Sequence, residues 1–374
     1  MNRNEPLFRV VKRDDQSPLR LIGFYVAAVV LALLIGTVLL TILGVPAGDY
    51  YTDMFTLGMI DNKYAYKQVE GFIKLFVPLL LTSMALSLAF KMRFWNIGGE
   101  GQFIMGAVGA GAVAFKLGET MPQPVVLLLM ALCGLLCGGL YGVFVAWLRM
   151  KYGTNETLMT LMLNYIALYF LQFLGETKAP WNFFLDPKSE RPKFAKFPDG
   201  GKMITFPIGK FNLNLTLLIA IIICVGIYVY LKYSKQGYEI AVVGDSPNTA
   251  RYAGMNVGKI VIRTIFLSAA MIGLAGAFYV ASAGTLSTSV TNDVGWTGII
   301  VAWLAQLNTI GIVVASLLIT VLQFGSQVAG ASYSTIDANF ADLLQGIILF
   351  IVLAADFFTR FKLVWRSKSG EVAK

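Results

Sequence analysis

The chain of 374 residues contains no histidine and few charged side chains. Without histidine it lacks the side chain most often used to bind zinc and to transfer protons near neutral pH. Only 14% of the residues are charged and 57% are hydrophobic, whereas soluble domains carry about 25% charged residues. Mean hydropathy is +0.69. This composition excludes an ordinary soluble globule and indicates a polytopic membrane protein.

Several kinds of chemistry also lack their usual residues. The three cysteines, Cys133, Cys137 and Cys224, lie in apolar runs, which is typical of small core residues and not of disulfides or metal ligands. No GxxxxGK[ST] phosphate-binding loop occurs, so the chain does not bind ATP through that motif. No span holds paired carboxylates, and no nucleophile has a neighbouring base. We therefore expect neither an enzyme nor a metal site, and the net charge of +9 indicates helix ends and not nucleic acid binding.

The apolar runs predict an all-α membrane protein of about ten passages, because about 20 apolar residues cross the bilayer core. One of these runs, 296–307, is too short for a full crossing and is interrupted at Asn308. Short or broken helices at membrane depth are tolerated only where they are buried in protein or line a cavity. The expected passages are 19–43, 72–90, 97–117, 125–148, 157–174, 213–231, 260–281, 296–307, 310–328 and 339–358.

The distribution of lysine and arginine predicts that both termini are cytoplasmic. Basic residues follow the ends of alternate passages and fill the C-terminal tail, whereas 282–295 and 329–338 contain none. If 296–307 belonged to one long helix with the next run, the basic tail would face outward, so we reject that alternative. The predicted parts are a cytoplasmic tail (1–18), a transmembrane domain (19–358) with an extracytoplasmic loop (175–212) and a cytoplasmic loop (233–259), and a second cytoplasmic tail (359–374).

Glycines recur at small-xxx-small spacing in two neighbouring passages. They are Gly106, Gly109 and Gly111 in one, and Gly134, Gly138 and Gly142 in the next. Such spacing lets helices approach closely. We interpret it as helix packing in preference to a direct role in a pore.

The cytoplasmic loop contains a polar island, GYEIAVVGDSPNTARYAG (237–254), between long apolar runs. Ser246 followed by Pro247 predicts the start of a helix, with the serine as N-cap and proline at the first position. Gly254 suits a left-handed C-terminal cap. We expect a short helix over 247–253 that docks a cytoplasmic motor protein, although an ordinary solvated loop with one helical turn explains the same pattern.

Polar residues also occur where membrane passages begin. Asn96, Glu100 and Gln102 lie in FWNIGGEGQF, and we expect Glu100 to cap a broken helix, with the adjacent glycines supplying free amides, in preference to contacting substrate. Asn155 and Glu156 are typical of an N-cap and an acidic first turn. Asn164 lies deeper and is a candidate for lining a polar route. All six are candidates for the translocation path or for a structural role.

Four stretches resemble a known family. FWNIGGEGQFIMGA (94–107), YGTNETLMTLMLNYIALY (152–169), GYEIAVVGDSPNTARYAGMNV (237–257) and SAAMIGLAGAFYV (268–280) are similar to permease subunits of bacterial ABC importers of the branched-chain amino acid and simple-sugar type. The NE…LNYIA form most resembles the nucleoside branch, which is associated with BMP lipoproteins. The resemblance extends from about residue 75 to residue 358 and does not include the N-terminal tail or the loop 175–212.

The resemblance implies a type II ABC importer permease in the bacterial cytoplasmic membrane. Its implied partners are ATPase subunits that bind ATP and Mg²⁺, a second and related permease chain, and an extracytoplasmic substrate-binding lipoprotein; the chain itself would hold no cofactor. The family often has an arginine where this chain has Ala241. A sugar importer with the same fold and an ATP-independent secondary carrier remain as alternatives. The residues implied in ATPase coupling are Gly237, Glu239, Gly244, Asp245, Ser246, Pro247, Ala250, Arg251, Tyr252 and Gly254.

Overall fold

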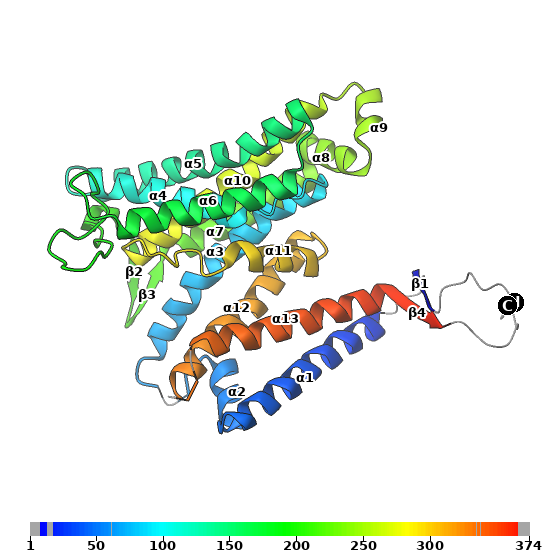
Figure 1. Cartoon of the computed structure of the whole chain (residues 1–374), viewed down its shortest axis with the longest axis horizontal. Helices are drawn as coiled ribbons and strands as arrows, with labels where there is room; N and C mark the ends of the chain where they lie inside the picture. Colours follow the sequence, from blue (N-terminus) through cyan, green and yellow to red (C-terminus); the bar gives the residue numbers. More distant parts are fainter. Residues whose placement is uncertain (1–7, 13–17, 61, 334, 337, 366–374) are drawn as a thin grey trace, which may run out of the picture. The chain divides into compact units, whose positions relative to one another are not determined.

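The computed structural model describes residues 8–12, 18–60, 62–333, 335–336 and 338–365 and consists mainly of α-helices (Figure 1). The helices are α1 (Pro18–Ile42), α2 (Ala47–Thr56), α3 (Ala65–Lys91), α4 (Gly99–Leu117), α5 (Gln123–Tyr152), α6 (Glu156–Glu176), α7 (Leu215–Tyr233), α8 (Lys235–Asp245), α9 (Pro247–Tyr252), α10 (Val257–Ala283), α11 (Val294–Leu304), α12 (Thr309–Ala331) and α13 (Ala338–Arg360). The strands are β1 (Phe8–Lys12), β2 (Thr205–Ile208), β3 (Phe211–Asn214) and β4 (Phe361–Trp365), and η1 (Asp199–Gly201) is a 3₁₀ turn.

Each of the ten expected passages coincides with a helix. Within the described residues, seven helices are long and apolar enough to cross a membrane, namely α3, α5, α6, α7, α10, α12 and the part of α13 over Asp342–Thr359. The interruption expected near Asn308 is present, because Gln306 and Leu307 adopt left-handed backbone angles between α11 and α12. The Asn308 side chain then caps α12 by accepting the amides of Ile310 and Gly311.

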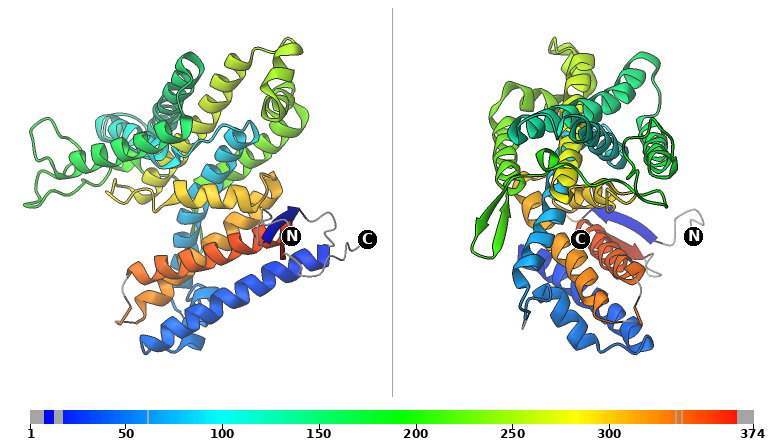
Figure 2. Two further views of the ribbon diagram at one scale, coloured as in Figure 1. Left: turned by 45° about the vertical axis from the view of Figure 1, so that its right-hand side comes forward. Right: turned by 90° about the vertical axis from the view of Figure 1, so that its left-hand side faces the viewer.

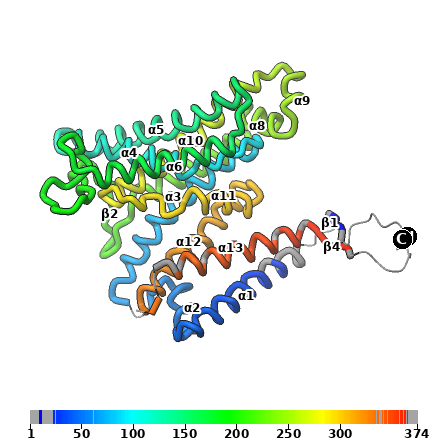
Figure 3. The backbone as a smooth tube through the Cα atoms, in the orientation of Figure 1, coloured from blue at the N-terminus to red at the C-terminus, as the bar shows by residue number. Residues whose placement is uncertain are grey.

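The chain forms two compact units, with one boundary after Ile60 and the other inside α12 after Phe324. The smaller unit contains α1, α2, α13, β1, β4 and the end of α12. The larger unit runs from α3 to the first part of α12 and is described first. Figure 2 gives two further views, and Figure 3 follows the backbone.

The core of the larger unit is α10, which packs against α3, α4 and α5. Their close approach depends on glycine. A Cβ on Gly273 of α10 would collide with the backbone of Gly134 and Gly138 on α5, and a Cβ on Gly106 of α4 would collide with Gly273. The glycine spacing therefore serves helix packing, as predicted.

The segment 175–212 is a folded cap. β2 and β3 form an antiparallel hairpin, and Lys196 bridges to Thr285. Phe197 is buried and packs edge-on against Phe115 of α4, with ring centroids 5.0 Å apart. Phe184, Leu185 and Phe194 are buried as well, so the apolar side chains of this segment form the core of the cap.

In the smaller unit, α1 packs against α13. β1 pairs antiparallel with β4, from Phe8 opposite Trp365 to Lys12 opposite Phe361. Parts of both predicted tails are thus strands, because their alternating apolar residues suit a two-stranded ribbon. The rest of the tails, 1–7, 13–17 and 366–374, lies outside the described residues. α2 is a further helix that the sequence did not predict.

Candidate functional site

The polar island folds into two short helices between α7 and α10. Ser234 caps α8 by accepting the amide of Gly237 at 3.0 Å, and Ser246 caps α9 by accepting the amide of Thr249 at 3.2 Å. Gly254 follows α9 with φ +76°, as predicted for a left-handed cap. Figure 1 shows α8 and α9 projecting from one end of the larger unit.

α8 and α9 are anchored by burial. Ile240 and Val243 of α8 and Ala250 of α9 are buried in one hydrophobic cluster, together with residues of α5 and α10. A Cβ on Gly244 would collide with the backbone of Lys91 at the end of α3, so only glycine permits this approach. Gly237 is equally tight against the carbonyl of Leu231. A six-residue helix is stable only when packed in this way.

An ion pair also fixes α8 to α10. Glu239 Oε2 lies 2.9 Å from Arg263 Nη2. Glu239 therefore has a structural partner inside the unit. The turn between α8 and α9, called the α8–α9 corner below, has an outer side that faces away from the protein. Tyr252 is 94% exposed there, and Asp245, Pro247 and Arg251 are also exposed.

A cavity of about 700 Å³ separates α9 from the junction between α5 and α6. Arg149 lies on its wall, 2.7 Å from Glu156 Oε1 and over the ring of Phe94 at 4.8 Å. Asn155 caps α6 through the amides of Thr157 and Leu158. Asn155 and Glu156 thus occupy the start of α6, as the sequence predicts.

The other polar candidates form a buried junction between the start of α4 and the middle of α6. Asn96 and Gln102 pair through their side-chain amides at 3.0 and 3.1 Å. Asn164 Nδ2 donates to the carbonyl of Ile97 at 2.8 Å, and its Oδ1 accepts the amide of Gly101 at 2.8 Å. Both polar atoms of Asn164 are therefore occupied by backbone, which braces the turn before α4.

Glu100 connects α4 to the short helix α11. Its Oε1 accepts the amides of Gly295 at 2.8 Å and Trp296 at 3.3 Å, and the residue is 7% exposed. The amides come from a segment 195 residues away and not from the glycines beside Glu100, so that detail of the prediction is wrong. Glycines on both sides instead permit the close approach. A Cβ on Gly99 would lie 3.2 Å from the Gly295 Cα, and a Cβ on Gly295 would collide with the Glu100 backbone.

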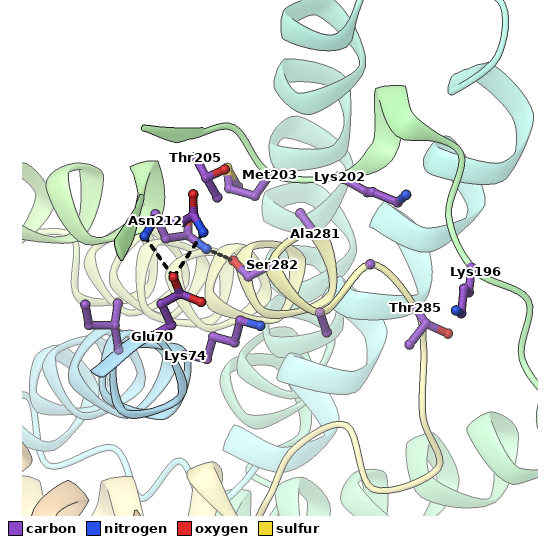
Figure 4. A pocket seen from close by; sticks show the side chains of 14 residues that line it. Glu70, Lys74, Lys196, Lys202, Met203, Thr205, Asn212, Ala281, Ser282 and Thr285 are labelled. Carbon is purple, nitrogen blue, oxygen red and sulfur yellow. Dashed lines mark hydrogen bonds between the residues drawn. The ribbon is translucent and has the colours of Figure 1, made fainter. Parts of the chain in front are cut away.

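A second cavity, of about 530 Å³ (Figure 4), lies beside β2 and β3, at the end of the larger unit away from α8 and α9 (Figure 1). It is bordered by the start of α3, the β2–β3 hairpin and the end of α10. Glu70 Oε1 accepts both the backbone and the side-chain amide of Asn212, at 2.8 and 3.1 Å. Lys74 and Lys196 also line it. Sequence reasoning missed this cavity because its walls come from three distant segments.

Within the described residues, no group of three or more Cys, Asp or Glu side chains is placed to hold a metal ion. What the larger unit presents is an exposed helical corner with a cavity behind it at one end, and a polar cavity at the other. Between them runs a bundle of apolar helices.

Comparison with known proteins agrees with this architecture. Residues 68–353 match the family described as the branched-chain amino acid transport system / permease component. The chain is 27% identical to the glucose ABC transporter permease protein TsgB13 of Haloferax volcanii, over 91% of this chain and 89% of the relative. It is also 27% identical to the nucleoside permease NupB of Lactococcus lactis (87% and 88% covered) and to the guanosine permease NupP of Bacillus subtilis (92% and 96%). Because the family match spans most of the chain and its helices supply several apolar spans, the protein belongs to the branched-chain amino acid transport system permease family and is a multi-pass membrane transport component.

Proposed function

We propose that this chain is the permease subunit of an ATP-driven importer of nucleosides in the bacterial cytoplasmic membrane, and that α8 and α9 dock its ATPase subunit. The observation that carries this proposal is the α8–α9 corner. It is buried on the inner side and leaves Tyr252 and Asp245 exposed, while the exposed Pro247 and Arg251 also line the 700 Å³ cavity. A rigidly anchored, outward-facing polar corner suits a protein partner.

Charge supports the orientation. The ends of α3, α5 and α7 that carry basic residues gather near α8 and α9: Lys91 contacts Gly244, and Arg149 shares a cavity with Arg251. In a membrane that end is cytoplasmic by the positive-inside rule. The β1–β4 pair joins the start of α1 to the end of α13, which favours an even number of passages with both termini on one side.

Nucleosides are the proposed cargo because the NE…LNYIA stretch of α6 resembles the nucleoside branch, and two relatives are named as nucleoside or guanosine permeases. A sugar is the second candidate, since the glucose permease is equally similar at 27% identity. We propose further that a second, related permease chain completes the pathway and that a substrate-binding lipoprotein delivers the cargo.

The test is nucleoside-stimulated ATP hydrolysis by the assembled complex in liposomes, with the binding protein present. Tyr252→Ala and Arg251→Ala should weaken co-purification of the ATPase and lower stimulated hydrolysis without changing insertion, because both side chains are exposed. Tyr64→Ala, a tyrosine of similar chemistry that is 53% exposed outside α8 and α9, is the control.

Unchanged hydrolysis in both corner variants would remove the docking role. Stimulation by glucose and not by nucleosides would support an ATP-driven importer whose substrate is a sugar. Uptake that needs no ATPase subunit would return the chain to the class of secondary carriers.

A further inference from the structure

One exposed face of α6 differs from the outer faces of the other spans. Its residues recur at helical spacing, with intervals of three or four and some adjacent pairs, which places them on one stripe along the helix. The opposite face, with Asn164, Ala167 and Leu171, is buried. The α6 stripe comprises Leu158, Met162, Tyr165, Ile166, Tyr169, Phe170 and Phe173, all exposed.

The stripe includes two tyrosines at the middle of the span. α6 is 21 residues long and begins and ends with a glutamate, Glu156 and Glu176. A helix of that length spans about 32 Å, close to the bilayer core of about 30 Å. Tyr165 lies next to the midpoint of the helix, and Tyr169 lies one turn farther along.

Exposed tyrosines elsewhere in the described residues avoid that depth. Tyr64, Tyr152, Tyr233, Tyr238 and Tyr252 lie at helix ends or outside the spans, where the polar hydroxyl meets water or lipid headgroups.

The outer faces of α5 and α7 are aliphatic at mid-span, as lipid contact requires. They present Leu132, Leu136 and Leu140 on α5, and Ile221, Ile222 and Val225 on α7.

The polar groups of the stripe have no partner in the described part of the chain. No hydrogen bond joins the hydroxyls of Tyr165 and Tyr169 to another residue there, and the amide of Gln172, three residues after Tyr169, is likewise unpaired although the residue is partly buried. Two hydroxyls and one amide within eight residues of helix would be left unsatisfied in hydrocarbon. Hydrocarbon could not satisfy these groups, which favours contact of this face with water or with polar groups.

We propose that the α6 stripe lines the solute pathway and that the rings of Tyr165 and Tyr169 are stacking surfaces for a planar nucleobase. This inference rests on the proposed import of nucleosides and identifies the helix face that contacts them. Aromatic rings stack on any base because each base has a π-face, while the two hydroxyls and Gln172 can hydrogen-bond to base edges or to the sugar.

The stripe is continuous with features at both ends. At its inner end, Asn155, Glu156 and Thr157 line the 700 Å³ cavity behind α9. At its outer end, Phe173 stacks on Trp181 with ring centroids 5.7 Å apart. A solute moving along the stripe would therefore pass from an aromatic pair, past the tyrosines, to the cavity beside the proposed docking helix.

The first test is water access in the assembled complex. In a chain with Cys133, Cys137 and Cys224 replaced by alanine, Tyr165→Cys and Tyr169→Cys are treated with a charged methanethiosulfonate. The control is Leu136→Cys, which lies near the middle of the outer face of α5. The two tyrosine positions should react at least about tenfold faster than position 136, because the reactive thiolate forms only where water reaches the sulfur. Equal, slow reaction at all three would overturn the proposal and indicate that lipid or a second permease chain covers the stripe.

The second test is protection by solute. Uridine supplied with the binding protein should slow labelling at positions 165 and 169, and an unrelated amino acid should not. Rapid labelling that uridine leaves unchanged would overturn the stacking role. Tyr169→Phe should retain nucleoside uptake, whereas Tyr169→Leu should lower it; equal uptake in both would also count against stacking. Labelling needs no ATP, so a result that overturns the role of the α6 stripe is distinguishable from failure of ATP-driven import.

Discussion

Replacing Glu100 separates a bracing role from a role in the solute pathway. In Glu100→Ala, the amides of Gly295 and Trp296 lose their acceptor in a buried site. An unsatisfied buried donor costs about 1–3 kcal/mol, and the second bond, at 3.3 Å, is the weaker. We expect a loss of roughly 2–4 kcal/mol in the free energy of unfolding, which corresponds to a fall of roughly 5–15 °C in the melting midpoint. Glu100→Gln keeps an acceptor oxygen of the same reach and should lose less than half as much.

The assay is intrinsic tryptophan fluorescence during heating in detergent, since Trp296 supplies one of the two amides that Glu100 accepts. Glu119→Ala, which removes an exposed glutamate just after α4, is the control and should leave the midpoint unchanged. Uptake is measured in parallel. The reasoning would be refuted if Glu100→Ala melted like the unsubstituted protein while both Glu100 variants lost uptake, because the carboxyl would then act on solute and not on α11.

Three further predictions concern packing. Gly273→Val should abolish a monodisperse peak in size-exclusion chromatography because its Cβ meets the α5 backbone, whereas Gly226→Val, with open space around it, should not. Asn164→Leu loses two 2.8 Å bonds and should cost about 2–4 kcal/mol, seen as a lower melting midpoint with the insertion level unchanged. Phe197→Ala removes a buried ring at a cost of about 3–5 kcal/mol, and limited proteolysis should then cleave within 175–212 faster than in the unsubstituted chain.

Hydropathy was sufficient to locate the long apolar helices, because an apolar run of that length has few alternatives to a helix. The break between α11 and α12 was also readable, since Asn308 interrupts an apolar run and then acts as a cap. The pairing of β1 with β4 could not be predicted from the sequence, because it joins residues at opposite ends of the chain. α8 was missed because Gly237 and Gly244 argue against a helix locally, and only contacts with Leu231 and Lys91 explain them.

The candidate sites likewise divide into those that neighbouring residues predict and those that depend on distant segments. Local caps such as Ser246 and Asn155 follow from neighbouring residues, and the structure has both. Glu100 required a partner 195 residues away, which no local pattern identifies. The α6 stripe was hidden for a different reason. Tyr165 and Tyr169 look like ordinary apolar-face residues until burial establishes which side of α6 faces outward.

α10 gives the proposed coupling a physical route. Its first turns, with Val257, Ile260 and Val261, belong to the cluster that buries α8 and α9, and its last turn lines the 530 Å³ cavity with Ala281 and Ser282. The helix has 27 residues and is therefore about 40 Å long. Midway, Gly273 lies in close contact with the backbone of α5 and α4. Because tightly packed interiors transmit strain, we expect a displacement applied at α9 to move α10 and these neighbouring helices together.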